Sequence, residues 1–599
     1  MLHSPPANML RIGGASAMWG DSLFGARQLV ERGEIDVLVG DYLAEVTMAI
    51  LARMRAKDPA AGYVPDWGLA MQPLLAEIKR RGILLVTNAG GMNPRACRDA
   101  FVAMAATQGL GFRVAVVEGD DLLPREAELR ALDPRGMDDD APLPARLASA
   151  NAYLGAGPIA AALDAGAEVV ITGRCVDSAL TLGALIHAFG WRADDYDRLA
   201  AGSLAGHLIE CGCQVTGGLF TDWREVAESA DGGWSDMGYP VLECRADGSV
   251  VVTKPAGTGG LIHRGAVAEQ MLYEIGDPRA YLLPDVACDF SRVTIEQESP
   301  RRVRVAGATG RAPGNRLKVC ATWPDGHRLL TTMMIAGWQA GAKAKRTGEA
   351  MIARARRLAL AAGLGDFAET SVEVIGAGDT YGRFDPEARE VVMKLGLRHA
   401  NPKALELLAR EFALPGVAMA QGSTGAFAGR PTPQPVLRVH SFLLDKTAVT
   451  IRVEVDGEAI PYAMHDGDKL EIPPPCDDMP RAAAVPPSQT FEVPLRKLAW
   501  GRSGDKGNHA NIGLIARRPE YAGIIKSQVT EDAVAACFDH YAPSRVTRWE
   551  LPGILGFNFL LENVLGGGGT GSLRYDPQGK TYAQMLLDLP IRVPGGDDV

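Results

Sequence analysis

GILLVTNAGGMNPRACRDAFVAMAATQG, residues 82–109, contains in one run the unit that decides the fold. An apolar stretch of strand length ends in a turn with two glycines, and a helix pattern follows. A proline lies near the first turn of that helix, where its missing N–H costs nothing. A strand, a turn and a helix in this order predict a right-handed crossover between parallel strands.

The same unit recurs on both sides of this run. Apolar stretches at 9–14, 35–41, 112–121 and 169–174 end in polar or glycine-containing turns. Helical patterns at 22–33, 42–56 and 178–191 follow three of them, and another at 158–166 precedes the last. Alternating strands and helices predict an α/β fold, so we expect a Rossmann-like parallel-sheet domain over residues 8–235.

The pattern changes after residue 235. Short β-like runs alternate irregularly with helices, and this texture predicts an α+β domain over residues 236–463. Residues 464–489 are rich in proline and read as an extended linker. Residues 490–599 then form a small C-terminal domain.

Composition excludes some classes of protein. The 599 residues carry a net charge of −10 with acids and bases interspersed, which argues against nucleic acid as the partner. No apolar run is long enough to span a bilayer, and the N-terminus lacks the features of a secretory signal. Nine scattered cysteines, an odd number, suit a reducing compartment. We therefore expect a cytoplasmic protein, a homo-oligomer, that binds a small molecule.

The carboxyl ends of the predicted strands carry the catalytic candidates, because ligands of open α/β sheets bind at that edge. Asn88 could stabilise an oxyanion, and Asp120 could act as a base. Arg174 and Asp177 form either a carboxylate clamp or a structural ion pair. Glu210 is the preferred acid or base, and it shares a helix face with His207 and Gln214.

Further residues are candidates for substrate binding because they lie in the same turns, or in two loops that follow later. The alternative for each is a purely structural role in its turn or cap. The candidates near the sheet are Gly13, Gly14, Ser16, Asp41, Gly90, Gly91, Asn93, Ser178, Gln214 and Lys254. Those in the C-terminal domain are Ser503, Asp505, Lys506, Asn508 and His509, all within the polar segment GRSGDKGNHANIG (501–513).

The sequence contains few motifs that indicate a cofactor. The first turn, GGASAMWGDS (13–22), lacks the strict GxGxxG fingerprint, so only Asp41 at the end of strand two suggests NAD. Cys211 and Cys213 form CxC without a second pair, so no metal site is predicted. We expect no cofactor beyond CoA as part of the substrate, although Mg²⁺ is compatible with the acidic residues because it needs few protein ligands.

The chain resembles the acyclic terpene utilisation protein A (AtuA) family in RIGGASAMWGDS, VTNAGGMNP, LAGHLIECGCQVTGG and TKPAGTGG. LAWGRSGDKGNHANIGLIAR resembles the small ferredoxin-fold domain that accompanies this family. The resemblance implies breakdown of branched terpenoid acids as CoA thioesters, and a lyase role on such a thioester. We therefore expect a cofactor-independent lyase or hydratase acting on a branched acyl-CoA, with or without a further carboxylate. The alternatives are a non-catalytic CoA-ligand-binding or assembly subunit and, less favoured, an NAD(P)-dependent oxidoreductase.

Overall fold

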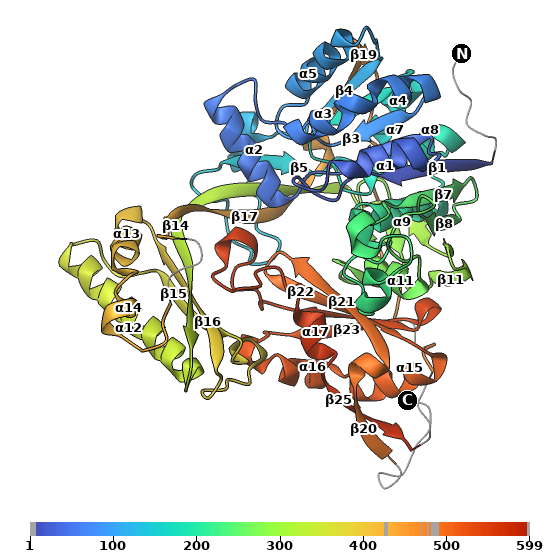
Figure 1. The fold of residues 1–599 in the computed structure, drawn as a ribbon. Coiled ribbons are helices and arrows are strands. Elements are labelled where there is room, and N and C mark those ends of the chain that lie inside the picture. Colours follow the sequence, from blue (N-terminus) through green and yellow to red (C-terminus); the bar gives the residue numbers. More distant parts are fainter. Residues whose placement is uncertain (1–7, 425–428, 469, 476–477, 481–489, 596–599) are drawn as a thin grey trace.

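The computed structural model describes residues 8–424, 429–468, 470–475, 478–480 and 490–595. Figure 1 shows three parts: an N-terminal α/β part, a lobe built on long strands, and a C-terminal domain packed below both. Within the described ranges, the search for a helix long and apolar enough to cross a membrane finds none.

Five parallel strands form the centre of the first part. Their order in the sheet is β1 (Met9–Gly14), β2 (Val37–Gly40), β3 (Leu84–Thr87), β6 (Val169–Thr172) and β4 (Val114–Glu118). Val37 and Val39 face one hydrophobic core while Leu38 faces the other, so both faces of the sheet are covered. The large sheet predicted from the strand–turn–helix units is confirmed, but its order differs from the 3-2-1-4-5-6 order of dinucleotide-binding folds.

Helices cover the two faces in two groups. One face packs against α1 (Phe24–Arg32), α3 (Pro65–Met71), α4 (Leu75–Arg81) and α5 (Pro94–Thr107), and the other against α7 (Gly157–Asp164), α8 (Ala179–Phe189) and α9 (Tyr196–Ile209). From β1 to β4, each new strand lies further along the sheet in one direction. The connection from β4 to β6 runs in the opposite direction, so a right-handed crossover places its helix, α7, on the opposite face of the sheet. The neighbouring strands β3 and β6 therefore feed α5 and α8 on opposite faces, so this pair of strands is the topological switch point of the sheet.

Antiparallel strands extend this sheet on both edges, to eleven strands among the described residues. β7 (Val241–Arg245), β8 (Val250–Thr253), β12 (Arg302–Ala306) and β11 (Thr294–Ser299) continue from β1, and β18 (Arg452–Val455) and β19 (Glu458–Ile460) continue from β4. The predicted boundary at residue 235 therefore does not coincide with a break in the structure. Residues 236–463 do not form one separate α+β unit, because their strands cover edges of the parallel sheet that would otherwise stay unpaired.

The long-stranded lobe is a second sheet. β14 (Arg316–Ala336) pairs with β17 (Gln434–Asp445) and β16 (Glu390–His399), and β15 (Glu369–Ile375) lies outside β16. α12 (Ala340–Ala361) and α13 (Pro402–Glu411) cover it with a hydrophobic core of its own. β5 (Ser149–Ala152) pairs with the first half of β14 and so joins the lobe to the first part.

The C-terminal domain is a four-stranded antiparallel sheet in the order β21 (Ala499–Lys506), β22 (His509–Ala516), β24 (Gly556–Leu561) and β23 (Val546–Leu551). Its helices are α15 (Pro519–Gln528), α16 (Glu531–Cys537) and α17 (Tyr582–Leu586), and β20 (Thr490–Pro494) pairs with β25 (Pro590–Pro594). The sheet also packs on α11 (Arg264–Leu272) of the first part.

This domain has a hydrophobic core of its own, which includes Leu514, Phe557 and Tyr582, and it also packs on the first part. Trp500, Ile515, Leu551 and Ile554 belong to the same buried cluster as the parallel sheet. Within the linker, Asp468 donates its backbone N–H to Pro313 at 2.8 Å. Residues 469, 476–477 and 481–489 of the predicted linker lie outside the described residues.

Candidate functional site

The loops after β1, β2 and β3 are tied together at the carboxyl edge of the sheet. Asn88 Nδ2 donates to Asp41 Oδ1 at 2.7 Å, and Asn88 Oδ1 accepts from the backbone of Tyr42 at 2.9 Å. Ser16 Oγ donates to the carbonyl of Asp41 at 2.8 Å. Sequence reasoning placed these residues at one edge, and the structure brings them together. Their hydrogen bonds hold one another in place, so the Asn88 amide is already engaged on both of its atoms.

Asp120 holds the loop after β6. Its Oδ2 accepts from the backbone N–H of Arg174 at 2.8 Å and from Asn151 Nδ2 at 2.9 Å. Gly173 provides the space, because a Cβ there would collide with the carboxylate. Burial raises the pKa of Asp120 to about 7, and the two hydrogen bonds only partly oppose this rise. Asp120 therefore supports the loop that presents Arg174.

Arg174 is buried in the loop after β6. It forms an ion pair with Asp177, donates to the Cys175 carbonyl at 2.9 Å, and places Cζ 4.1 Å from the centroid of the Tyr153 ring. Its Nε has no hydrogen-bond partner, and neither has the buried hydroxyl of Ser178. A buried donor without a partner is costly, so these atoms are suited to meet a ligand.

Glu45, the first residue of α2 (Glu45–Lys57), belongs to the same group although the sequence analysis did not single it out. Tyr153 donates its hydroxyl to Glu45 Oε1 at 2.7 Å, and Lys318 Nζ lies 3.5 Å from that oxygen. Burial opposes ionisation of Glu45, but the charges of Lys318 and Arg174 outweigh it and lower the pKa to about 2. Glu45 is therefore a fixed anion.

Glu210 and His207 share a proton at the end of α9. His207 Nε2 lies 3.1 Å from the carbonyl of Met271, which can only accept, so Nε2 carries hydrogen. His207 Nδ1 lies 3.0 Å from Glu210 Oε1, so that contact also needs a hydrogen, on the carboxyl or on the ring. Burial raises the pKa of Glu210 although His207 opposes the rise. The buried Oε2 of Glu210 has no partner.

The C-terminal domain supplies the remaining charges. Lys580 Nζ lies 3.1 Å from Glu274 Oε1 and 3.7 Å from Asp505 Oδ1. Burial raises the pKa of Asp505 to about 6 and lowers that of Lys580 to about 8. Burial also lowers the pKa of Lys506, whose charge acts on Glu210.

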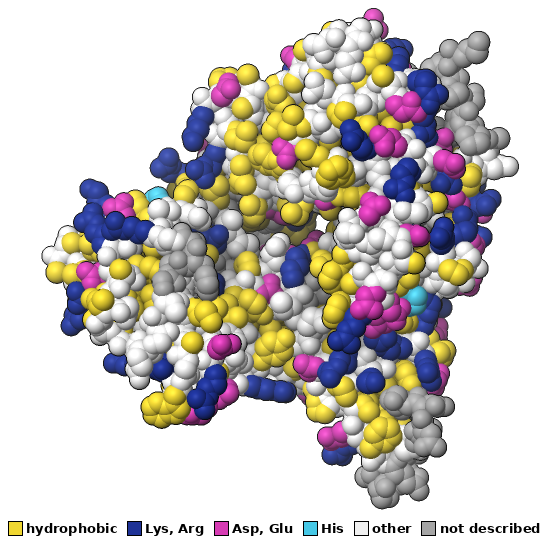
Figure 2. Space-filling model, viewed as in Figure 1, with side chains coloured by type: hydrophobic (Ala, Val, Ile, Leu, Met, Phe, Trp, Pro, Cys, Tyr) yellow, Lys and Arg dark blue, Asp and Glu magenta, His cyan; other side chains and the backbone are white. Residues whose placement is uncertain are grey.

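We define the site cluster as the charged residues at this junction that act on one another. Asp177 and Glu274 keep exposed side-chain fractions of 37% and 36% although their neighbourhood is crowded with protein. Water therefore reaches both carboxylates, and Figure 2 shows a recess on this face of the molecule where the three parts meet. The members of the site cluster are Asp41, Glu45, Arg174, Asp177, Glu210, Glu274, Lys318, Asp505, Lys506 and Lys580.

Several predicted binding residues have other roles. A Cβ at Gly14 would collide with Ile209, so this glycine lets α9 pack against β1. A Cβ at Gly13 would press on Leu29 and Ile35. Gly91 has φ of +51° in the turn after β3, where its N–H bonds the Asn88 carbonyl at 3.0 Å.

The other turn residues of the first part are also engaged. A Cβ at Gly90 would collide with the Thr172 carbonyl, so this glycine lets the β3 and β6 loops touch. Asn93 caps α5, and its Nδ2 donates to the carbonyls of Pro59 and Ala61. Lys254 donates to the Thr258 carbonyl within its own loop. The charged residues that act on Lys254 all lie outside the site cluster.

In the C-terminal domain, the predicted polar loop is a hairpin, because β21 and β22 pair up to Lys506 and His509. Ser503 accepts from the Ala583 N–H at 2.9 Å, and Asn508 accepts from Gly567 at 2.7 Å. His509 Nδ1 accepts from Asn563 at 3.0 Å. Gln214 lies in a short 3-10 helix (Gly212–Gln214) beyond the end of α9, so it does not share a helix face with His207, and it accepts from Arg502 of β21 at 2.6 Å. Asp505 and Lys506 at the hairpin tip are the residues that reach the site cluster.

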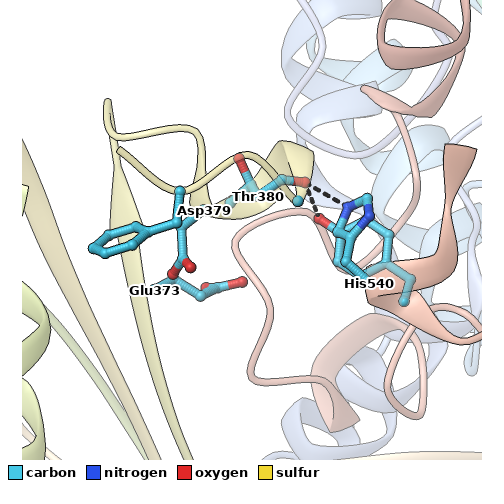
Figure 3. Close-up of a pocket in the computed structure, with 7 residues that line it drawn as sticks. Glu373, Asp379, Thr380 and His540 are labelled. Atoms are coloured by element: carbon cyan, nitrogen blue, oxygen red, sulfur yellow. Dashed lines mark hydrogen bonds between the residues drawn. The ribbon is translucent and has the colours of Figure 1, made fainter. Parts of the chain in front are cut away.

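A separate pocket of about 310 Å³ lies between the long-stranded lobe and the C-terminal domain (Figure 3). His540 Nε2 and the Tyr541 hydroxyl both donate to the Thr380 carbonyl, at 2.9 and 3.0 Å. Its acids are already paired, Glu373 with Lys394 at 2.7 Å and Asp379 with Lys345 at 3.3 Å. The acids of this pocket therefore have cationic partners within the protein.

Comparisons with known proteins give two family matches. A model described as acyclic terpene utilisation family protein AtuA matches residues 10–455, and one described as AtuA ferredoxin-like domain matches residues 493–592. No curated protein and no solved structure matches the chain. In the part of the chain that the structure describes, no group of three or more His, Cys, Asp and Glu side chains is arranged to hold a metal ion.

Proposed function

The chain belongs to the acyclic terpene utilisation family AtuA, and on this basis we propose that it is a cofactor-independent lyase or hydratase acting on a branched, carboxylated acyl-CoA thioester. The observation that carries the proposal is the 3.0 Å contact between His207 Nδ1 and Glu210 Oε1, in a ring whose Nε2 lies 3.1 Å from the Met271 carbonyl. The pair lies at the end of α9, next to Gly14 at the end of β1, and charges from both matched regions, those of Asp177 and Lys506, act on Glu210. Cleavage beside a thioester requires such an acid–base group.

The residues can be given roles in a lyase reaction. A base removes the proton of a 3-hydroxyl group, the bond between C2 and C3 breaks, and the thioester leaves as an enolate. The enolate then takes a proton at C2 from the acid, which restores the balance of protons. Glu210 fits the acid or the base, and the Lys506 ammonium fits the stabilisation of the enolate oxygen. In a hydratase the same groups would move the proton at C2 and the departing hydroxyl.

Arg174 and Ser178 favour a substrate that carries a carboxylate. The Nε of Arg174 and the hydroxyl of Ser178 are buried donors without partners, and a carboxylate accepts from such groups. The recess opens onto the surface in Figure 2, which suits a substrate whose large carrier group stays outside.

Fewer observations support the two alternative functions, an oxidoreductase and a non-catalytic binding subunit. An NAD(P)-dependent oxidoreductase would need an open glycine turn after β1, but Ile209 packs against Gly14 there. Asp41, the residue that suggested a ribose contact, accepts from Asn88 instead. A non-catalytic CoA-ligand-binding subunit remains the competing candidate, because the same cluster would bind a ligand without converting it.

One assay separates these candidates. The full-length protein is incubated with 3-hydroxy-3-methylglutaryl-CoA and with branched 3-hydroxyacyl-CoA and enoyl-CoA thioesters, and products are followed by mass spectrometry. Calorimetry measures binding in parallel. Conversion supports the proposal. Binding of a thioester without conversion would indicate a binding subunit, and neither binding nor conversion would contradict the whole substrate class.

A further inference from the structure

The segment 272–276 leaves the end of α11 and carries two residues of the junction, Tyr273 and Glu274. Glu274 has φ of +57°, a left-handed conformation that is unfavourable for a residue with a side chain. Such strain persists only where surrounding contacts enforce it.

Two asparagines of the C-terminal domain enforce it. Asn511 Oδ1 accepts from the backbone N–H of Glu274 at 2.8 Å, while its Nδ2 donates to the Leu272 carbonyl at 2.8 Å. Asn558 Nδ2 donates to the carbonyls of Ile275 and Gly276 at 3.0 and 2.7 Å. Both asparagines are fully buried, and a 2.8 Å hydrogen bond joins them.

The surface of β21 and β22 is shaped for this segment. A Cβ at Gly513 would lie 2.5 Å from Leu272 Cβ, and a Cβ at Gly504 would lie 2.5 Å from the Tyr273 ring. The two glycines thus allow the side chains of Leu272 and Tyr273 to pack directly against the backbone of the sheet. Because the fit is close on both sides, the segment has one position when the C-terminal domain is docked.

That position brings the Glu274 carboxylate to 3.1 Å from Lys580 Nζ. Lys580 Nζ also donates to the Tyr273 hydroxyl. Asp505, whose Oδ1 lies 3.7 Å from the same Lys580 Nζ, and Lys506 act on this carboxylate in opposite directions. The charged groups from two regions of the chain thus meet around one carboxylate.

We propose that Asn511 is a positioning residue, which holds Glu274 in its left-handed conformation so that its carboxylate meets Lys580 and the hairpin tip. The C-terminal domain would then complete the site cluster instead of merely covering it. This inference rests on the proposed acid–base function.

The test uses full-length Asn511→Ala, Asn558→Ala and the control Arg517→Met. Arg517 pairs with Asp222 at 2.6 Å across the same domain interface, but it lies outside the site cluster. Two readouts are taken: kcat and KM on the converted thioester, and the rate at which acetic anhydride modifies Lys580, followed by peptide mass spectrometry.

Both asparagine variants are expected to lower kcat at least 10-fold with KM changed less than 3-fold, and to change the Lys580 modification rate at least 3-fold. Arg517→Met is expected to lower the melting temperature and to leave kcat and the modification rate unchanged. Equal loss of kcat in Asn511→Ala and Arg517→Met would overturn the inference, because it would show that Asn511 acts only by holding the C-terminal domain against the first part. If no thioester is converted, the proposed function fails, and an unchanged Lys580 modification rate in Asn511→Ala would separately overturn the positioning role.

Discussion

The Cζ atom of Arg174 lies 4.1 Å from the centroid of the Tyr153 ring, and the same ring has Lys318 Nζ at 4.9 Å. Tyr153 also donates its hydroxyl to Glu45. One aromatic residue thus contacts two cations and an anion. This arrangement fixes the direction of the Arg174 guanidinium and leaves its Nε without a partner.

Arg174→Ala is expected to weaken binding of a carboxylated thioester by roughly 2–5 kcal/mol, because a buried carboxylate would lose its charged partner. An otherwise identical thioester with a methyl ester in place of the carboxylate is the control, and its binding should change little. Calorimetry on both compounds checks the prediction. Unchanged affinity together with a lower melting temperature would instead support a structural Arg174–Asp177 pair.

Asp120→Asn is expected to stabilise the protein at pH 8 but not at pH 4. The Asp120 carboxyl ionises near pH 4 in the unfolded chain and with a pKa of about 7 in the fold. The folded state binds more protons between these values, so wild-type stability falls as the pH rises through them. The gain at pH 8 should be a few kcal/mol, because a tenfold change in an ionisation constant corresponds to roughly 1.4 kcal/mol.

Urea unfolding at both pH values measures this difference. The exposed Asp99 on α5 provides the control, Asp99→Asn. A stability difference between Asp120→Asn and the wild type that is the same at pH 4 and pH 8 would show that the fold does not raise the pKa of this carboxyl.

The pH dependence of kcat/KM should be bell-shaped. Asp505 is ionised above its pKa of about 6, and Lys580 is charged below its pKa of about 8, so the two charges coexist only between these values. Lys580→Arg keeps its charge at all relevant pH values and should remove the alkaline limb. Rate measurements from pH 5 to pH 9 on both proteins check this, and an identical alkaline limb in Lys580→Arg would refute the assignment.

Residues 1–463 and 490–599, produced as two chains, are expected to copurify. Trp500, Ile515, Leu551 and Ile554 share a core with the parallel sheet, so either chain alone exposes apolar surface. Co-expression with a tag on one chain, followed by size-exclusion chromatography, measures the association. Two independently stable monomers would show that the linker does separate two cores.

The sequence was sufficient to predict the residues that follow directly from a strand. Asp41, Arg174 and Asp177 each come just after a parallel strand, and Glu210 ends a helix that packs on the same sheet. Strand periodicity and the edge rule for α/β sheets locate such residues without tertiary information.

Other members of the site cluster could not be found in this way. Glu274 and Lys580 meet only because the C-terminal sheet packs on α11, and Lys318 joins because β14 pairs with β5. These contacts join segments that are distant in the sequence, so the hydrophobic periodicity of one segment does not indicate them. Glu45 could have been predicted from the sequence, since it lies four residues after Asp41 at the start of a helix. An acidic residue at that position is, however, also explained by its favourable interaction with the helix N-terminus.

The comparison of Glu210→Gln with Glu269→Gln tests the central claim most directly. Glu269 is a buried carboxyl on α11 with a pKa raised by burial to about 8, and it lies outside the site cluster. On a converted thioester, Glu210→Gln is expected to lower kcat at least 100-fold, in line with the loss of an acid–base group, with substrate affinity kept within about 3-fold. Glu269→Gln is expected to retain wild-type kcat. Equal kcat in Glu210→Gln and the wild type would contradict the account.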